Sequence, residues 1–201
     1  MKKERSILLL LLLILPFDLS AQQETQFVEK KGRSTFIADN PSLLKSFYFH
    51  DLKISLPKNS TALSDTIKQG LQQQMEASSP SGFEYEVGLV HADTSGNLYA
   101  VSRIKNAVPD SGFAYLKAYS PGAAGEFKLR KLILDPVILR EYGFVKSGYI
   151  VRQLFVHSSK NVYEIDFLVS SVWSAEMIET YESVLASVGF LQGSPLKGGI
   201  R

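Results

Sequence analysis

The chain has 201 residues, of which 45% are hydrophobic and 21% are charged, and its formal net charge is +2. This composition excludes collagen-like, coiled-coil and disordered chains and is typical of a globular protein. A net charge this small gives no sign of a basic surface, so nucleic-acid binding is not expected.

The first 22 residues have the layout of a secretory signal peptide. A basic start precedes nine apolar residues, Ile7 to Leu15, and the small residue Ala21 places the expected cleavage between Ala21 and Gln22. A helix of that apolar length spans roughly 14 Å, about half of the ~30 Å hydrocarbon core, which disfavours a membrane anchor. We therefore expect a secreted or periplasmic protein with no membrane span after cleavage of residues 1–21. With no cysteine in the chain, neither disulfides nor a lipoprotein anchor are expected.

The remaining chain divides into a partly ordered lead-in at 22–46, a single α+β domain at 47–191 and a flexible tail at 192–201. The first strand is predicted over Phe47 to Leu56, where alternate residues are apolar before Pro57. The period then changes to four over Ala62 to Ala77, which predicts an amphipathic helix. Its apolar stripe consists of Leu63, Ile67, Leu71 and Met75.

A hairpin is predicted next, with strands at 83–92 and 97–107 around the turn Asp93-Thr94-Ser95-Gly96. In its first strand, Phe83, Tyr85, Val87 and Leu89 alternate with Glu84, Glu86 and Gly88. Residues 113–142 mix strand and helix patterns, and we expect at least one helix there, broken at Pro136.

A second hairpin is predicted from strands at 144–157 and 161–170. With His157 opposite Val162, one face is apolar and faces the core. It comprises Ile150, Leu154, Val156, Tyr163, Ile165, Phe167 and Val169. The opposite face is mixed, which indicates helices on both sides of the sheet. It comprises Tyr149, Val151, Gln153, Phe155, His157, Glu164 and Asp166.

The last element is a helix capped by Ser174 and ended by Gly189. The order of strand, helix, hairpin, mixed segment, hairpin and helix predicts an α+β fold. The expected architecture is an antiparallel β-sheet with helices packed on both faces, an αβα sandwich.

Three stretches carry a resemblance to a known family. They are the strand Phe49 to Pro57, the hairpin from Gly148 to Phe167, and the closing helix through Ser187. In this order they resemble the PsbP-like fold, an αβα sandwich shared by extrinsic photosystem II proteins and Mog-type nuclear-import factors. The resemblance implies a non-catalytic binding or assembly module and supplies no catalytic residue.

The chemistry-bearing residues form no complete constellation in the sequence. His50, His91 and His157 all fall in predicted strands, but no two have the spacing of metal ligands. The subset that comes nearest to a metal site is His157 with Glu164 and Asp166, since cross-strand neighbours lie about 5 to 8 Å apart. We expect these three to form a solvated polar face instead. No catalytic residue, resident metal or cofactor is assigned.

These patterns predict an exported, non-catalytic binding or assembly module of the cell envelope or extracellular space. Its partner would be a protein or an envelope component that the sequence does not identify. Two alternatives stay open: a metal-dependent enzyme that uses His157, Glu164 and Asp166, and a binder of a small apolar ligand. In the second alternative, Tyr149, Val151 and Phe155 line the pocket.

Overall fold

The computed structural model describes residues 42, 44–78, 83–107, 128–134, 137–146, 149–170 and 175–191. The predicted signal peptide, the tail and most of the lead-in lie outside these residues, as does Ser174. No helix within the described ranges is long and apolar enough to span a bilayer.

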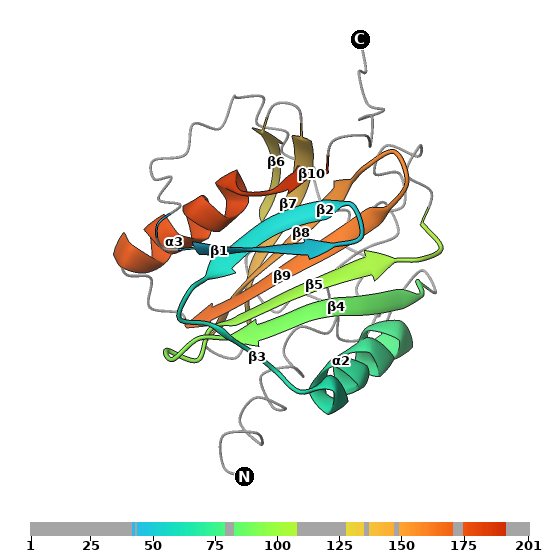
Figure 1. Ribbon diagram of the computed structural model, residues 1–201, viewed down its shortest axis with the longest axis horizontal. Helices are drawn as coiled ribbons and strands as arrows, with labels where there is room; N and C mark the ends of the chain where they lie inside the picture. Colours follow the sequence, from blue (N-terminus) through green and yellow to red (C-terminus); the bar gives the residue numbers. More distant parts are fainter. Residues whose placement is uncertain are drawn as a thin grey trace.

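Two antiparallel sheets form the framework (Figure 1). The small sheet has the order β1-β2-β10, with β1 at Leu44–Phe49, β2 at Leu52–Pro57 and β10 at Gly189–Phe190. The large sheet has seven strands in the order β3-β4-β5-β9-β8-β7-β6. Its strands are β3 at Thr61–Ala62, β4 at Tyr85–Ala92, β5 at Leu98–Ile104, β6 at Lys128–Leu134, β7 at Val137–Lys146, β8 at Tyr149–His157 and β9 at Val162–Ser170.

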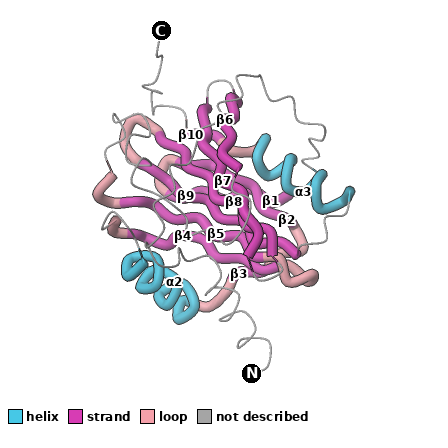
Figure 2. The backbone as a smooth tube through the Cα atoms, turned by 180° about the vertical axis from the view of Figure 1, so that it is seen from behind, coloured by secondary structure: helices cyan, strands magenta, loops and turns pink. Residues whose placement is uncertain are grey.

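Each face of the large sheet has its own core. Helix α2, Asp65–Ser78, packs on one face, where its buried stripe meets β4, β5, β8 and β9. Helix α3, Ala175–Ala186, and the small sheet pack together on the other face. Figure 1 shows α3 and the small sheet in front of the large sheet, and Figure 2 shows α2 on the rear side. The α+β class with helices on both faces is therefore confirmed.

Helix α2 also protects the free edge of β4. On the side away from β5, β4 pairs only with the two residues of β3 in the described sheet. Its backbone N–H groups bond to α2 side chains instead: Tyr85 N donates to Glu76 Oε1 at 3.0 Å, and Val87 N donates to Gln72 Oε1 at 3.4 Å. Covering an edge in this way prevents pairing with foreign strands.

The single strand predicted over Phe47 to Leu56 is wrong. The chain reverses at His50 and Asp51 and forms the β1–β2 hairpin. His50 has a φ of 53°, in the left-handed region that residues with a side chain rarely adopt. Because neither Gly nor Asn-Gly marks this turn, the sequence pattern runs through it without a signal.

The predicted alternation along β4 is also wrong after Val87. Pairing with β5 shifts between Val87 and Leu89, which is a β-bulge at Gly88. As a result Val87 packs against the core under α2, whereas Leu89 packs against the opposite core. A Cβ at position 88 would overlap the ring of Phe49, so the bulge brings the small sheet close to β4.

Three element boundaries differ from the predictions. Residues 128–134, part of the segment with mixed strand and helix patterns, are strand, and residues 137–142 are strand rather than the expected helix. The rest of 113–142 lies outside the described residues. Residues 144–146 belong to β7, since β8 starts only at Tyr149. The helix predicted from Ala62 begins at Asp65, because Thr61 and Ala62 pair with β4 as β3.

Candidate functional site

Glu164 and Asp166 lie two residues apart on β9 and therefore share one face of the large sheet. This is the face under α2, where the β9 residues on either side of them, Val162 and Leu168, belong to the core. The strand register places Gln153 of β8 opposite Asp166 and Ser102 of β5 opposite Glu164. The predicted register, with His157 opposite Val162, is confirmed.

This acidic pair is sealed from solvent. Glu164 is 2% exposed and Asp166 is 0% exposed. The expected solvated polar face is therefore wrong, because β8 and β9 lie in the interior of a seven-stranded sheet and α2 packs over this face. Gln153 Nε2 donates to Glu164 Oε1 at 3.2 Å. Among the described residues, neither Glu164 Oε2 nor either oxygen of Asp166 has a hydrogen-bond partner.

Burial shifts the ionisation of both acids in the same direction. Desolvation raises the pKa of Glu164 well above its ordinary value, and the neighbouring charge of Asp166 raises it further. Desolvation likewise raises the pKa of Asp166. A carboxylate without compensating donors is costly in a core, so such groups take up protons instead of carrying charge. The two side chains consequently behave as one coupled pair.

His157 does not complete a metal site with the pair. It lies at the end of β8 on the same face and is half-buried, two residues along the strand from the pairing of Phe155 with Glu164. Within the described part of the chain, no group of three or more His, Asp or Glu is placed to hold a metal. The structure thus brings Glu164 and Asp166 together without gathering His157 to them.

The other predicted histidines have separate environments. His91 Nδ1 lies 3.2 Å from Ser60 Oγ, and the His91 ring meets the ring of Phe47 edge-on at 4.7 Å. Burial, with the positive charges of Lys45 and Lys68, lowers the pKa of His91. His50 lies in the β1–β2 turn rather than in a strand.

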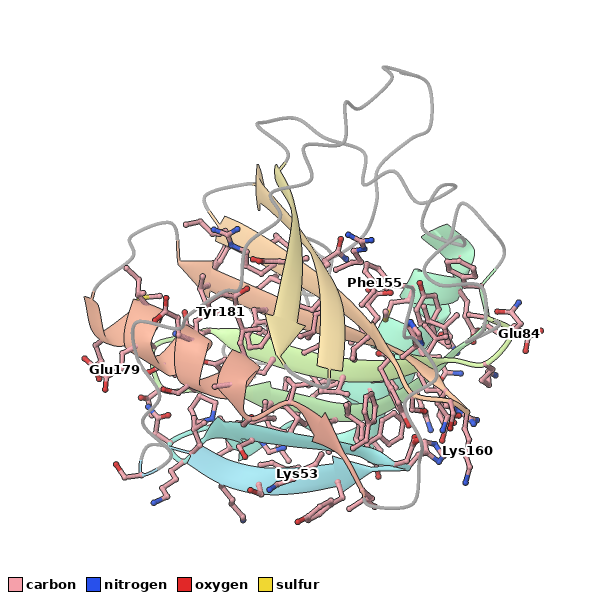
Figure 3. All side chains as sticks on the ribbon, turned by 90° about the horizontal axis from the view of Figure 1, so that it is seen from above. Lys53, Glu84, Phe155, Lys160, Glu179 and Tyr181 are labelled. Carbon is pink, nitrogen blue, oxygen red and sulfur yellow. The ribbon has the colours of Figure 1, made fainter. Side chains whose placement is uncertain are left out.

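The proposed apolar lining is part of the packed interior. Val151 and Phe155 are fully buried and belong to the core under α2. Figure 3 labels Phe155. Tyr149 is half-buried at the start of β8. Val151 and Phe155 therefore pack in the core under α2 instead of lining an open surface.

A second polar cluster was missed by the sequence analysis. The carboxylate of Asp51, in the β1–β2 turn, accepts hydrogen bonds from the Tyr163 hydroxyl and, at 2.8 Å, from Asn161 Nδ2. The backbone oxygen of Asp51 accepts from Leu191 N at 2.9 Å. Burial and the adjacent Asp51 carboxylate raise the pKa of Tyr163, which keeps the phenol protonated as a donor. Asp51 thereby ties the small sheet to β9.

The same cluster continues across β4 and β5. Arg103 Nη2 pairs with Glu86 Oε2 at 2.6 Å, and His50 Nε2 lies 3.1 Å from Glu86 Oε1. Burial opposes ionisation of Glu86, but His50 and Arg103 outweigh it and lower the pKa of this carboxyl. Arg103 Nη1 also donates to Asn161 Oδ1 at 3.3 Å. No local spacing signals this cluster, because its members come from four separate segments.

Comparison with known proteins gives a likeness of fold. No family model matches the chain. A search among curated proteins also finds no match. Among solved structures, cyanobacterial PsbP (CyanoP) from Synechocystis sp. PCC 6803 matches with a TM-score of 0.43 and 11% sequence identity. The match covers 80% of this chain and 99% of that one. This is a weak similarity to PsbP at the level of the fold alone.

Proposed function

We propose that the protein is an exported, non-catalytic binding or assembly module of the cell envelope or extracellular space. We further propose that it recognises an acidic partner protein through the outer face of the small sheet. The observation that carries the proposal is Tyr48, which is 58% exposed on that face, the most exposed of the large hydrophobic side chains in the described residues. A large aromatic side chain held in solvent on a rigid strand is typical of a recognition surface.

The register defines the composition of this face. Tyr48 of β1 is directly opposite Lys53 of β2, so the two side chains project from the same side of the sheet. Leu52 and Ile54, the neighbours of Lys53 along β2, are buried against the large sheet. Figure 3 shows Lys53 on the small sheet, on the side away from α2. The face therefore combines an apolar ring with a cation.

Charge favours an acidic partner. Three exposed lysines lie on or next to the β1–β2 hairpin. Lys53 shares the face of Tyr48, Lys58 follows β2, and Lys45 reaches over the Phe47 ring at the edge of the hairpin. The one acid of the hairpin, Asp51, is turned inward to Tyr163 and Asn161. Electrostatic complementarity of this kind directs association toward a negative surface. Lipid-binding clusters hold about four to eight basic residues, so three lysines favour a protein over an anionic membrane.

Export is supported by the leader, whose basic, apolar and small-residue parts follow one another in the first 22 residues. The test is N-terminal sequencing of the protein recovered from the medium or the envelope fraction of expressing cells. Cleavage after Ala21 is expected. An uncleaved chain that stays in the cytoplasm would contradict the proposal.

The recognition face is tested with poly-glutamate as the acidic probe and vesicles of phosphatidylglycerol as the membrane probe. Salt-sensitive binding to poly-glutamate is expected, with a loss of about tenfold or more in Lys53→Glu and in Tyr48→Ala. Lys105→Glu is the matched control, since Lys105 is also exposed but pairs with Glu84 at the end of β5. It should bind the probe like the wild type.

Three outcomes would overturn the proposal. Equal losses in Lys53→Glu and Lys105→Glu would show that only net charge matters. Stronger binding to the vesicles than to poly-glutamate would show that the face meets lipid. Turnover of a substrate by the purified chain would show that the protein is an enzyme.

A further inference from the structure

We propose that Glu164 and Asp166 hold one proton between them, and that the loss of this proton at alkaline pH releases α2 from the large sheet. The two carboxyls would then act as a pH-sensitive latch in the core. This inference is independent of the proposed recognition face, which lies on the opposite side of the large sheet.

The geometry requires a positive charge or a proton at this site. Three carboxyl oxygens, Glu164 Oε2 and both of Asp166, are buried without a hydrogen-bond partner in the described ranges. Two adjacent anions in a sealed core would repel each other and lose their hydration. A single shared proton removes one charge and converts one of the unpaired oxygens into a donor for the other carboxyl.

Two short chains of contacts connect the pair to α2. The Tyr85 side chain of β4 lies close enough to Glu164 to oppose the desolvation that raises the pKa of this carboxyl, and the backbone N–H of Tyr85 donates to Glu76 Oε1 on α2 at 3.0 Å. Ser102, opposite Glu164 on β5, donates to Met75 Sδ on α2 at 3.7 Å. Helix α2 is therefore the element that must move if water is to reach the pair.

The other titratable groups on this side of the large sheet do not account for the expected response to pH. Helix α2 contributes Glu76, β4 contributes Tyr85, and β8 contributes Tyr149 and His157. Arg140 of β7 lies on the same face of the sheet as Glu164, two strands away. It pairs with Phe155 of β8, which in turn pairs with Glu164. Of these groups only His157 has an ordinary pKa near neutral, and its deprotonation removes positive charge rather than adding negative charge.

Amide hydrogen exchange of the full chain tests the latch. After correction for intrinsic rates, the protection of α2 amides, such as that of Leu71, should fall about tenfold or more between neutral and alkaline pH. Amides of α3, such as that of Val184, should change little. In Asp166→Asn the pH dependence of the α2 amide protection should disappear. Glu164→Gln is the second variant, and it should likewise abolish the pH dependence of the α2 amide protection.

The matched control is Glu84→Gln, which removes an exposed carboxyl near the same helix and should keep the wild-type profile. The proposal is overturned if α2 protection in the wild type is independent of pH, or if Asp166→Asn and Glu164→Gln keep the wild-type dependence. It is also overturned if calcium or zinc chloride restores protection at alkaline pH in the wild type alone, since a metal would then neutralise the pair.

Discussion

Tyr181 on α3 donates a hydrogen bond from its hydroxyl to Glu141 Oε1 on β7 at 2.7 Å. Glu141 is 0% exposed, and Arg152 Nη1 of β8 lies 3.2 Å from the same oxygen. Figure 3 shows Tyr181 projecting from α3 toward the large sheet. The buried carboxylate thus has two donors from different elements, in contrast to the Asp166 carboxyl on the opposite face.

Tyr181→Phe should lower the free energy of unfolding by about 1.5–3 kcal/mol, because it removes one donor from a buried carboxylate. Urea denaturation of the full chain measures this loss. Tyr48→Phe is the control, since the exposed hydroxyl of Tyr48 should contribute within about 0.5 kcal/mol. Equal effects of the two changes would contradict the role assigned to the Tyr181 hydroxyl.

Asp51→Ala should loosen the small sheet. The change removes the acceptor of Tyr163 and Asn161 and leaves the buried phenol hydroxyl without this partner, at a cost of about 1–3 kcal/mol. The rate of hydrogen exchange should rise more in β1 and β2 than in β8. Lys53→Ala is the control and should leave the exchange rates of all three strands unchanged. Uniform loss of protection across the two sheets would show that Asp51 does not act as a local tie.

Alanine substitutions at two glycines should change the stability of the protein in opposite directions. At Gly88 a Cβ would overlap the Phe49 ring, so Gly88→Ala should cost about 1–3 kcal/mol through overpacking. At Gly70, inside α2, a Cβ meets nothing within 4 Å, so Gly70→Ala should stabilise by about 0.5–1 kcal/mol. Thermal unfolding compares them directly. Stabilisation by Gly88→Ala would contradict the close approach of β1 to the bulge.

Stability should fall as pH rises through the neutral range. Both acids of the pair have a raised pKa in the folded chain, so the unfolded chain releases their protons first. Below about pH 4 both states are protonated and the pair imposes no penalty. As pH rises from there through the folded-state pKa, stability is lost at up to about 1.4 kcal/mol per pH unit for each proton. Asp166→Asn should flatten this slope, and a slope unchanged in the variant would place its origin elsewhere.

Elements with a regular apolar period were predictable from the sequence. The stripe of Leu63, Ile67, Leu71 and Met75 packs on the core under α2, as its spacing predicts. The register of His157 opposite Val162 is confirmed, and a one-residue slip would move the apolar row of β9 to the other face of the sheet. These features depend on which residues of an element are buried, and the local pattern of apolar residues indicates that burial.

Features set by contacts between distant segments were not predictable. The turn at His50 uses a backbone conformation that its residue type does not announce. The burial of Glu164 and Asp166 depends on α2 and on strands far away in the chain, so the polar side chains themselves suggested a solvated face. The Asp51 cluster joins positions 112 residues apart, and no local motif carries such a contact.

The most direct test of the buried pair is infrared difference spectroscopy of the full chain between acidic and neutral pH, with Asp166→Asn and Glu164→Gln as references. A protonated carboxyl band should persist at neutral pH in the wild type and be altered or lost in both variants. A wild-type spectrum in which every carboxyl is ionised at neutral pH would contradict the shared proton and the latch built on it.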